Sequence, residues 1–357
     1  KPVRSVAGIV ERNQSLPVVS NILIEQKGVD VTFSTTDLDI QIRTSASVGV
    51  EGCEGSITLN AQKFSEILGA LDTLDVDIDD GGLADLTTSG GHFSMQTLPA
   101  QDFPVLKIMP WTTTFTLPAK TLRYLLTMTA FAMAPKDIRY FLMGVLFVVE
   151  GAKLIAVATD THRLAYCEAE IDGLNQETKI EAIVPRKTVR ELLRILPEDD
   201  TPVTVNVGDT QIGFNFAGIE FVSKLIEGKF PDYQRVMPTL DTNPQCVSIN
   251  REELLLALRR VQILTNERFH GIRWLFTKGS LTVQGSNAEQ EEASQKLAVN
   301  WEWDDLDIGF NLLYMIELLN NLKNSEVNFH FAATPKSVLV TMPESSSFRY
   351  LIMPMRI

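Results

Sequence analysis

The segment "ATDTHRLAY" (158–166) holds the side chains best suited to chemistry, Asp160 and His162, with Arg163 beside them. An aspartate close to a histidine at the end of a strand can supply metal ligands, or a base and the group that orients it. No third ligand stands at a recognisable spacing, and the sequence contains no GxSxG, HExxH or P-loop motif. We therefore favour a polar turn that shapes a surface, and keep a hydrolase using Asp160 and His162 as an alternative.

The remaining histidines and the cysteines give no further sign of catalysis. His92, His270 and His330 fall singly in strand-like or loop segments. The three cysteines are far apart and form no CxxC pair, so neither a zinc site nor a disulfide framework is indicated. We predict no catalytic residue, no metal and no cofactor.

No segment reads as a membrane span or a secretion signal. The longest apolar run, "YFLMGVLFVV" (140–149), has about half the length that a bilayer-spanning helix needs. No signal-peptide pattern opens the sequence. We expect a cytoplasmic protein with free thiols and no membrane partner.

The elements that must position these side chains recur along the chain. Segments 115–134 and 247–266 each read as a short alternating strand, a polar step and an apolar helical pattern of about twelve residues. Alternating segments with hairpin turns follow each of them. The same strand–turn–helix unit returns in a second form at 55–71, 180–196 and 306–322. Two such halves make one domain.

The repeats predict three domains, 1–110, 111–240 and 241–357, in a chain of 357 residues. The opening "KPVRSVAGIVERNQ" (1–14) matches the later part of a first helix, so we expect the first domain to lack its first strand in this chain. No βαβ rhythm points to a parallel sheet. The predicted class is α+β, with antiparallel sheets and two helices per domain.

The charge pattern separates the helices from the chain as a whole. A net charge of −13 argues against a surface that attracts nucleic acid everywhere. In "PRKTVRELLRIL" (185–196), however, Arg186, Arg190 and Arg194 share one helical face, with Lys187 at its edge. Other predicted helices carry basic residues too, among them Lys63 and Arg123, whereas acidic residues collect at 72–80 and 289–292. Helices that face one way would present cations to phosphates without reading sequence.

Short motifs spread over nearly the whole chain carry a family resemblance. They are "LPVVSNILI" (16–24), "TDLDI" (36–40), "TLPAQDFP" (97–104), "FAMAPKDIRYFLMGVL" (131–146), "AVATDTHRLA" (156–165), "VPRK" (184–187), "SKLIEGKFPDYQRV" (223–236) and "MPMRI" (353–357). In this order, the motifs resemble those of the bacterial DNA polymerase III beta subunits, the sliding clamps. No single motif would be specific alone.

The resemblance implies a fold and a function. Three clamp domains per subunit would join head to tail with a second subunit, closing a six-domain ring around duplex DNA with helices inside and sheets outside. Such a clamp does no chemistry: it is a processivity factor that tethers the replicative polymerase. The implied partners are a second copy of the chain, double-stranded DNA of any sequence, the DNA polymerase III alpha subunit, the clamp loader, and other polymerases and repair proteins that carry clamp-binding peptides.

The resemblance also implies a peptide-binding cleft between the second and third domains. A groove of Met, Leu and Pro with cationic edges suits short peptides with apolar anchors. At one position the chain departs from the family, because Thr161 stands where a glycine is usual. The predicted cleft residues are Leu142, Thr159, Thr161, His162, Arg163, Leu164, Pro231, Arg235, Val236, Asn311, Tyr314, Leu351, Met353, Pro354, Met355 and Arg356.

Two further surfaces follow from the resemblance. At the ring seam, Ile263 and Leu264 would pack against Phe93 and Met95 of the partner, with Glu289 and Glu291 in ion pairs. DNA-facing positions would be Lys63, Arg123, Tyr140, Arg186, Lys187, Arg190 and Arg194. Asn13, next to Arg12, takes the place of an arginine that commonly contacts DNA in the family. The alternative is a repeat-built scaffold that binds peptides and never encircles DNA.

The chain ends on the apolar stretch "YLIMPMRI" (350–357), which is unusual for a terminus. The alternation in "FRYLIMPM" (348–355) predicts the final strand of the last half-repeat. We expect Met353–Ile357 to form one wall of the cleft, opposite His162–Leu164.

Overall fold

The computed structural model describes residues 2–10, 16–47, 54–71, 75–78, 82–88, 90–171, 179–238, 245–332, 336–343 and 345–357. They form two compact units, Lys1–Arg123 with Lys187–Ile226, and Tyr124–Arg186 with Glu227–Ile357. Arg12, Asn13, Cys53 and most of the acidic segment 72–80 lie outside the described residues.

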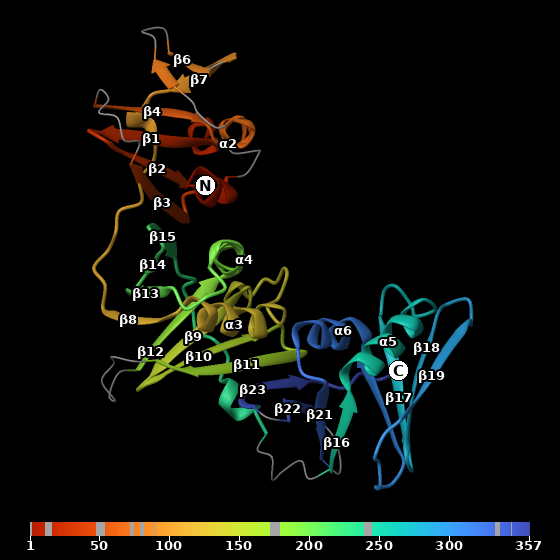
Figure 1. The fold of residues 1–357 in the computed structure, drawn as a ribbon. Coiled ribbons are helices and arrows are strands. Elements are labelled where there is room, and N and C mark those ends of the chain that lie inside the picture. Colours follow the sequence, from red (N-terminus) through yellow and green to blue (C-terminus); the bar gives the residue numbers. More distant parts are fainter. Residues whose placement is uncertain are drawn as a thin grey trace. The chain divides into compact units, whose positions relative to one another are not determined.

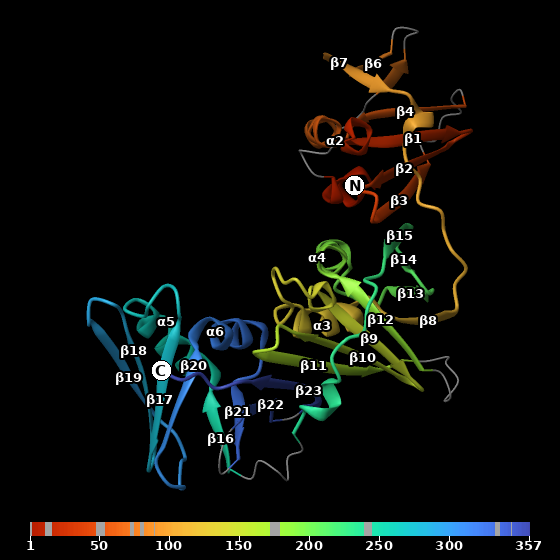
Figure 2. The same ribbon diagram turned by 180° about the vertical axis from the view of Figure 1, so that it is seen from behind.

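The first unit is built on one antiparallel sheet with the strand order β5-β6-β7-β4-β1-β2-β3-β15-β14-β13-β8 (Figure 1). Two helices, α1 and α2, lie beside strands β1 to β4 (Figure 2). Its elements are α1 (Pro2–Val6), η1 (Ala7–Ile9), η2 (Pro17–Ser20), β1 (Asn21–Lys27), β2 (Asp30–Thr36), β3 (Ile40–Ser47), β4 (Gly55–Asn60), α2 (Ala61–Ala70), β5 (Asp75–Ile78), β6 (Leu83–Thr88), β7 (Gly91–Leu98), η3 (Ala100–Asp102), β8 (Thr113–Pro118), β13 (Pro202–Val207), β14 (Gln211–Phe216) and β15 (Ile219–Lys224).

The second unit contains an antiparallel sheet ordered β12-β9-β10-β11-β23-β22-β21-β16 and a smaller one ordered β19-β18-β17-β20. Helices α5 and α6 pack on each other. Its elements are η4 (Tyr140–Leu142), β9 (Gly144–Glu150), β10 (Lys153–Thr159), β11 (Arg163–Glu170), β12 (Lys179–Pro185), η5 (Tyr233–Arg235), β16 (Gln245–Asn250), α5 (Arg251–Gln262), β17 (Gly271–Thr277), β18 (Ser280–Ser286), β19 (Glu292–Ala298), β20 (Leu306–Asn311), α6 (Leu312–Asn321), β21 (Glu326–Phe331), β22 (Val338–Met342) and β23 (Ser345–Ile352). Helices α3 (Ala119–Ala130) and α4 (Arg186–Ile195) each contribute residues to both units.

The predicted repeat is confirmed by the element order. One strand, one helix and three strands follow one another five times, beginning at β4, β8, β12, β16 and β20. The described part of the chain opens instead with α1, followed by β1, β2 and β3. Three tandem domains of two halves each account for this order.

Local sequence explains where the helices begin. The side chains of Asn250 and Asn311 accept hydrogen bonds from the first backbone N–H groups of α5 and α6, which have no partner inside a helix. In α4, Val189 and Leu192 are buried, whereas Arg190 is exposed, because apolar residues recur at helical spacing.

None of the described helices is long and apolar enough to cross a lipid bilayer.

Candidate functional site

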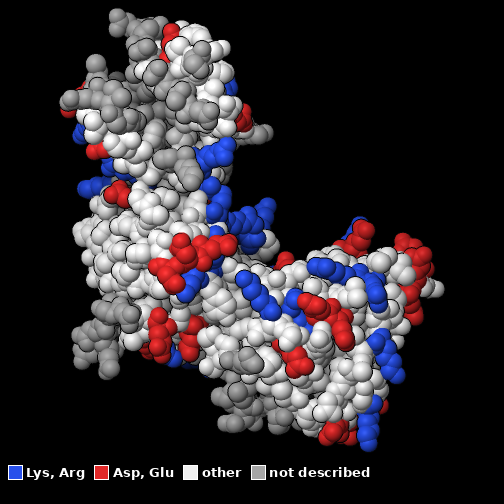
Figure 3. All heavy atoms as spheres, in the orientation of Figure 1, with Lys and Arg blue, Asp and Glu red and all other residues white. Residues whose placement is uncertain are grey.

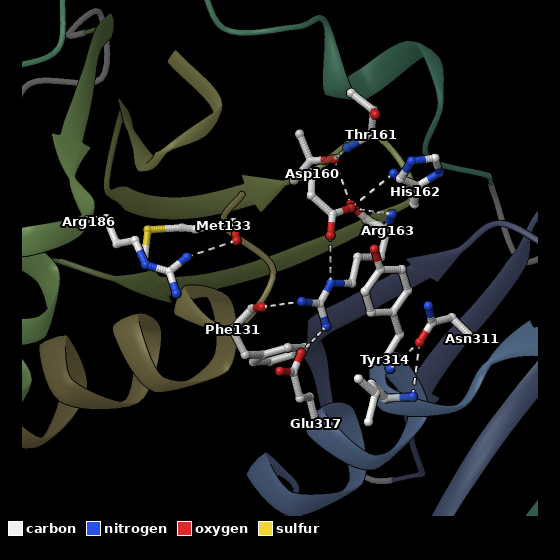
Figure 4. A network of polar contacts seen from close by, with 12 residues as sticks. Phe131, Met133, Asp160, Thr161, His162, Arg163, Arg186, Asn311, Tyr314 and Glu317 are labelled. Atoms are coloured by element: carbon white, nitrogen blue, oxygen red, sulfur yellow. Dashed lines mark hydrogen bonds and ion pairs between the residues drawn. The ribbon is translucent and has the colours of Figure 1, made fainter. Parts of the chain in front are cut away.

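The turn between β10 and β11 is fixed by its own side chains (Figure 4). Oδ1 of Asp160 accepts hydrogen bonds from the backbone N–H groups of His162 and Arg163, both at 3.0 Å. The Thr159 hydroxyl donates to the Arg163 carbonyl at 2.6 Å and accepts from the Thr161 N–H at 3.0 Å. This pattern places Thr161 at φ 75°, a left-handed conformation that a β-branched residue rarely adopts.

Asp160 is thus a structural residue of the turn. Besides the two backbone bonds, its Oδ2 accepts from Nε of Arg163 at 3.1 Å, and its side chain is only 9% exposed. A carboxylate held in this way does not orient the imidazole of His162. This geometry agrees with the polar turn that we favoured for this segment from its sequence.

The C-terminal segment lies beside this turn. Strand β23 pairs with β11 in antiparallel register, with Ile352 opposite Arg163. Beyond β23, the Met353 N–H donates to the His162 carbonyl at 2.9 Å, and the Met355 N–H donates to the Gly309 carbonyl at 2.8 Å. The last residues are therefore held against the turn on one side and β20 on the other.

Arg163 is the centre of a buried polar network. Its side chain is 5% exposed, donates to Asp160, Glu317 and, at 2.6 Å, the Phe131 carbonyl, and lies 4.1 Å from the centre of the Tyr314 ring (Figure 4). Although burial by itself opposes the charged form, the nearby acidic groups raise the pKa of Arg163 above its ordinary value. Burial, with the charge of Asp160, raises the pKa of Tyr314 to about 12.

The predicted cleft residues divide by exposure. Thr161, His162, Pro231, Arg235, Val236, Met353 and Arg356 are exposed, and Asn311, Tyr314, Pro354 and Met355 are half-buried. Leu142, Thr159, Arg163, Leu164 and Leu351 are buried. The segment that carries Arg235 and Val236 is anchored to β11 through Tyr233, whose ring centre lies 6.1 Å from that of Tyr166. The exposed members thus include the apolar residues Val236 and Met353 and the cations Arg235 and Arg356.

Sequence reasoning missed two residues that shape this site, Phe131 and Glu317, whereas Ile357 belongs to the segment that was expected to form a wall of the cleft. Glu317 lies one turn after Tyr314 on α6 and accepts from Arg163. Ile357 lies over two glycines: a Cβ built on Gly309 would be 2.5 Å from its Cδ1, and one on Gly271 would be 3.6 Å away. Tyr314 and Glu317 are three residues apart and so lie on one face of α6. This spacing was the signal in the sequence that could have indicated the contact between Glu317 and Arg163.

The predicted seam residues are mostly exposed. Ile263 is 78% exposed at the end of α5, and Phe93 on β7 is 38% exposed. Met95 is buried at 7%, so it packs within its own domain. Glu289 and Glu291 are exposed, Leu264 is half-buried, and Phe269 nearby is a further large apolar residue, 69% exposed.

Several of the predicted DNA-facing cations bind groups of the chain itself. Arg123 donates to the Leu196 carbonyl at 2.7 Å, and Arg186 donates to the Met133 carbonyl at 3.1 Å. Lys187 forms an ion pair with Asp37. Arg194 donates to the carbonyls of Arg4 and Ser5 and pairs with Glu191. These contacts hold elements together as well as placing positive charge.

Other predicted DNA-facing positions lie open. Lys63 and Arg190 are exposed, and Tyr140 is 58% exposed. Lys and Arg side chains gather around α4, whereas basic and acidic side chains intermix over α5 and α6 (Figure 3). Within the described residues, α4 is thus a strongly basic helix.

The three tandem two-half domains define the class of the protein as a DNA clamp fold. The families described as DNA polymerase III beta subunit, N-terminal, central and C-terminal domain match residues 1–107, 116–232 and 234–356. The beta sliding clamp of Pseudomonas aeruginosa is 37% identical over 100% of this chain and 97% of its own length, and that of Escherichia coli K12 is 36% identical over the same shares. The crystal structure of the DNA polymerase III subunit beta from Pseudomonas aeruginosa superimposes with a TM-score of 0.94 at 36% identity, covering 100% of this chain and 97% of that one.

The chain belongs to the bacterial beta sliding clamp family, the beta subunits of DNA polymerase III. Its role is that of a sliding clamp, a processivity factor in DNA replication.

Proposed function

We propose that two copies of this chain close head to tail into a ring around duplex DNA and hold partner proteins through the site at the β10–β11 turn. The ring is supported by a repeated strand pairing. The last strand of one half-domain pairs with the last strand of another at both junctions within the chain, β3 with β15 and β11 with β23. Strands β7 and β19 are the remaining two of this kind.

Both remaining strands have room for a partner. Among the described strands, β19 pairs only with β18, and along Gly91–Gln96 β7 pairs only with β6. An unpaired edge is a template for another chain. Pairing β19 of one copy with β7 of the next would bring Ile263 and Leu264 to Phe93, and two such seams close a symmetric ring.

The DNA-facing side is supported by α4 and by the exposed residues Lys63, Arg190 and Tyr140. Contacts of this kind reach phosphates and ignore sequence, so DNA association without a loader is weak and falls with salt. The clamp itself performs no chemistry and acts by topology. It works in the cytoplasm, where bacterial replication takes place.

The peptide site is supported by the exposed apolar residues Val236 and Met353 and by the exposed cations Arg235 and Arg356. Short segments with apolar anchors and an acidic group fit this surface. The proposed owners of such segments are the DNA polymerase III alpha subunit, the clamp loader, other polymerases and repair proteins. Their tethering raises the effective concentration of each at the template.

Primer extension on a singly primed circular template tests this function. With the polymerase and loader of the same cell and an excess of competitor template, the chain is expected to lengthen the products made in one binding event. Products of unchanged length, from a preparation that is dimeric and binds the polymerase, would contradict it.

A further inference from the structure

The side chain of Arg163 is turned into the protein, although it belongs to the predicted peptide-binding set. It is 5% exposed, and its guanidinium donates in three directions, to Asp160, Glu317 and the Phe131 carbonyl. Glu317 belongs to α6, whereas Phe131 follows α3. One buried cation therefore joins α6 to the turn before β11 and to the segment after α3.

The internal repeat gives an independent view of this position. The turn Thr36–Ile40 has the same hydrogen bonds as Thr159–Arg163, including N–H groups of residues 39 and 40 donating to Asp37 Oδ1 and the Thr36 hydroxyl donating to the Ile40 carbonyl. Leu38 stands at φ 78°, as Thr161 stands at φ 75°. The strand contact also repeats, because the Lys224 N–H donates to the Asp39 carbonyl at 2.8 Å, as Met353 does to His162 at 2.9 Å.

Under this equivalence Arg163 takes the place of Ile40. Ile40 lies opposite Ser223 and is 1% exposed, so the position belongs to the interior of the junction between two domains. Counted from the start of each helix, Tyr314 takes the place of Thr188, which is buried and hydrogen-bonded to Ser223 at 2.6 Å. One junction is closed by an aliphatic side chain, hydroxyls and the ion pair of Lys187 with Asp37, the other by an arginine, an aromatic ring and a carboxylate.

We infer that Arg163 is a positioning residue, which holds α6 against β11 and so sets the distance between His162 and the Asn311–Tyr314 end of the site, without contacting the peptide itself. The inference rests on the peptide-binding function proposed above. Peptide contacts then fall to the exposed set, above all His162, Met353 and Arg235. A guanidinium is suited to this task, because its rigid fork of five donors can serve several acceptors at once, which an ammonium cannot do in the same geometry.

Glu317 offers the sharpest test, because the two roles of Arg163 predict opposite results for Glu317→Gln. If Arg163 only positions α6, weakening its hydrogen bond to Glu317 loosens the site and lowers the affinity for every peptide alike. If Arg163 contacts a peptide carboxylate, removing the competing carboxylate strengthens binding of acidic peptides. The side chain of Glu317 is 48% exposed, so the variant is expected to fold.

The probes are a fluorescein-labelled pentapeptide with two leucines and a phenylalanine around one aspartate, and the same peptide with asparagine. We expect Glu317→Gln and Arg163→Lys to raise both dissociation constants at least fivefold and by the same factor. Arg235→Ala is expected to reduce the preference for the aspartate peptide. Glu191→Gln is the matched control, because Glu191 is the repeat equivalent of Glu317 and pairs with Arg194. Tighter aspartate-peptide binding by Glu317→Gln would overturn the inference.

A second measurement needs no peptide. Hydrogen exchange of the free protein is expected to speed up at the backbone amides of Leu313, Tyr314 and Met353 in Glu317→Gln, and not in Glu191→Gln. Unchanged exchange there would overturn the positioning role. Failure of the wild-type chain to bind either peptide would instead count against the proposed function.

Discussion

The guanidinium of Arg163 lies 4.1 Å from the centre of the Tyr314 ring, which joins β11 to the first turn of α6. A cation over an aromatic face is attracted by the ring's charge distribution, more strongly when both are shielded from water. Since Tyr314 follows the helix cap at Asn311, the contact fixes the start of α6 beside the His162 turn. The proposed peptide site thus coincides with a junction between two domains.

The first prediction concerns the seam. Ile263→Ala is expected to remove about 2 kcal/mol of apolar burial per seam, so about 4 kcal/mol and roughly a thousandfold in dimer dissociation for a ring with two seams. Since Ile263 is 78% exposed in the single chain, the stability of the monomer is expected to change little. Sedimentation equilibrium measures the dissociation constant.

The matched control for the seam is Leu256→Ala, which truncates a residue of α5 that is 50% exposed and outside the proposed seam. It is expected to leave the dimer intact. Equal dissociation constants for the wild type and Ile263→Ala would rule out the proposed packing of Ile263 at the seam.

The second prediction concerns backbone strain at Thr161. A non-glycine residue in the left-handed region costs about 1–2 kcal/mol, part of which glycine loses again through its flexible unfolded state. Thr161→Gly is therefore expected to stabilise the protein by about 0.5–1 kcal/mol. Thr161→Ala keeps the Cβ and is expected to gain much less. Urea unfolding measures both, and a destabilised glycine variant would show that φ 75° is not a source of strain.

The third prediction concerns the glycine beneath the C-terminus. A Cβ on Gly309 would lie 2.5 Å from Ile357 and 2.6 Å from the Met355 carbonyl oxygen, so the terminal segment must move in Gly309→Ala. Peptide affinity is expected to fall at least tenfold, with the dimer unchanged. Gly55→Ala is the control, because a Cβ at Gly55 meets open space among the described atoms. Unaltered peptide binding in Gly309→Ala would separate the terminus from the site.

Deletion of Met353–Ile357 is the fourth prediction. It removes both the Met353–His162 and the Met355–Gly309 hydrogen bonds but no residue of the proposed seam. Peptide binding, measured by fluorescence anisotropy, is expected to be lost while the chain stays dimeric by light scattering. A truncated chain that binds peptide as well as the full one would refute the assignment of this segment.

The fifth prediction concerns acid stability. Burial by itself opposes ionisation of Glu168, but hydrogen bonds from Tyr166 and Lys153 hold its pKa below the ordinary value. A depressed folded-state pKa stabilises the protein above the unfolded pKa of about 4.3, and this contribution is lost as the pH falls through the folded pKa. Glu168→Gln is thus expected to lose about 1–2 kcal/mol at pH 7, and this difference from the wild type is expected to shrink as the pH falls from 7 to 3.

The control for Glu168 is Glu170→Gln, at an exposed position of the same strand. Chemical unfolding at each pH gives the difference in the free energy of unfolding. A difference that stays constant from pH 7 to pH 3 would mean that the charge of Glu168 is not its cause.

The fold was largely predictable because its signals are local. The helical pattern of 185–196 and the strand before it correspond to α4 and β12, and the repeated strand–helix–strands unit recurs as predicted. Hydrophobic periodicity depends on neighbours in sequence, and hairpin turns on a few residues.

The detailed roles of the charged residues were not predictable in this way. Arg163 is buried among acceptors that lie far from it in the sequence: Phe131 is 32 residues away and Glu317 is 154 residues away. Local sequence patterns do not reveal such partners. Arg194 fits the exposed basic face of α4, yet it donates to carbonyls 189 and 190 residues away. Amphipathic spacing shows which face of a helix points away from the core on which the helix packs. It does not show which residues of other elements contact that face.

Retention on circular DNA tests the central claim most directly. The chain is loaded onto a nicked circular plasmid by the clamp loader of the same cell, free protein is removed by gel filtration, and half of the sample is linearised with a restriction enzyme. A closed ring is expected to stay on the circles at a salt concentration that abolishes contacts to phosphates, and to slide off the linear molecules. Equal retention on circular and linear DNA would contradict the ring.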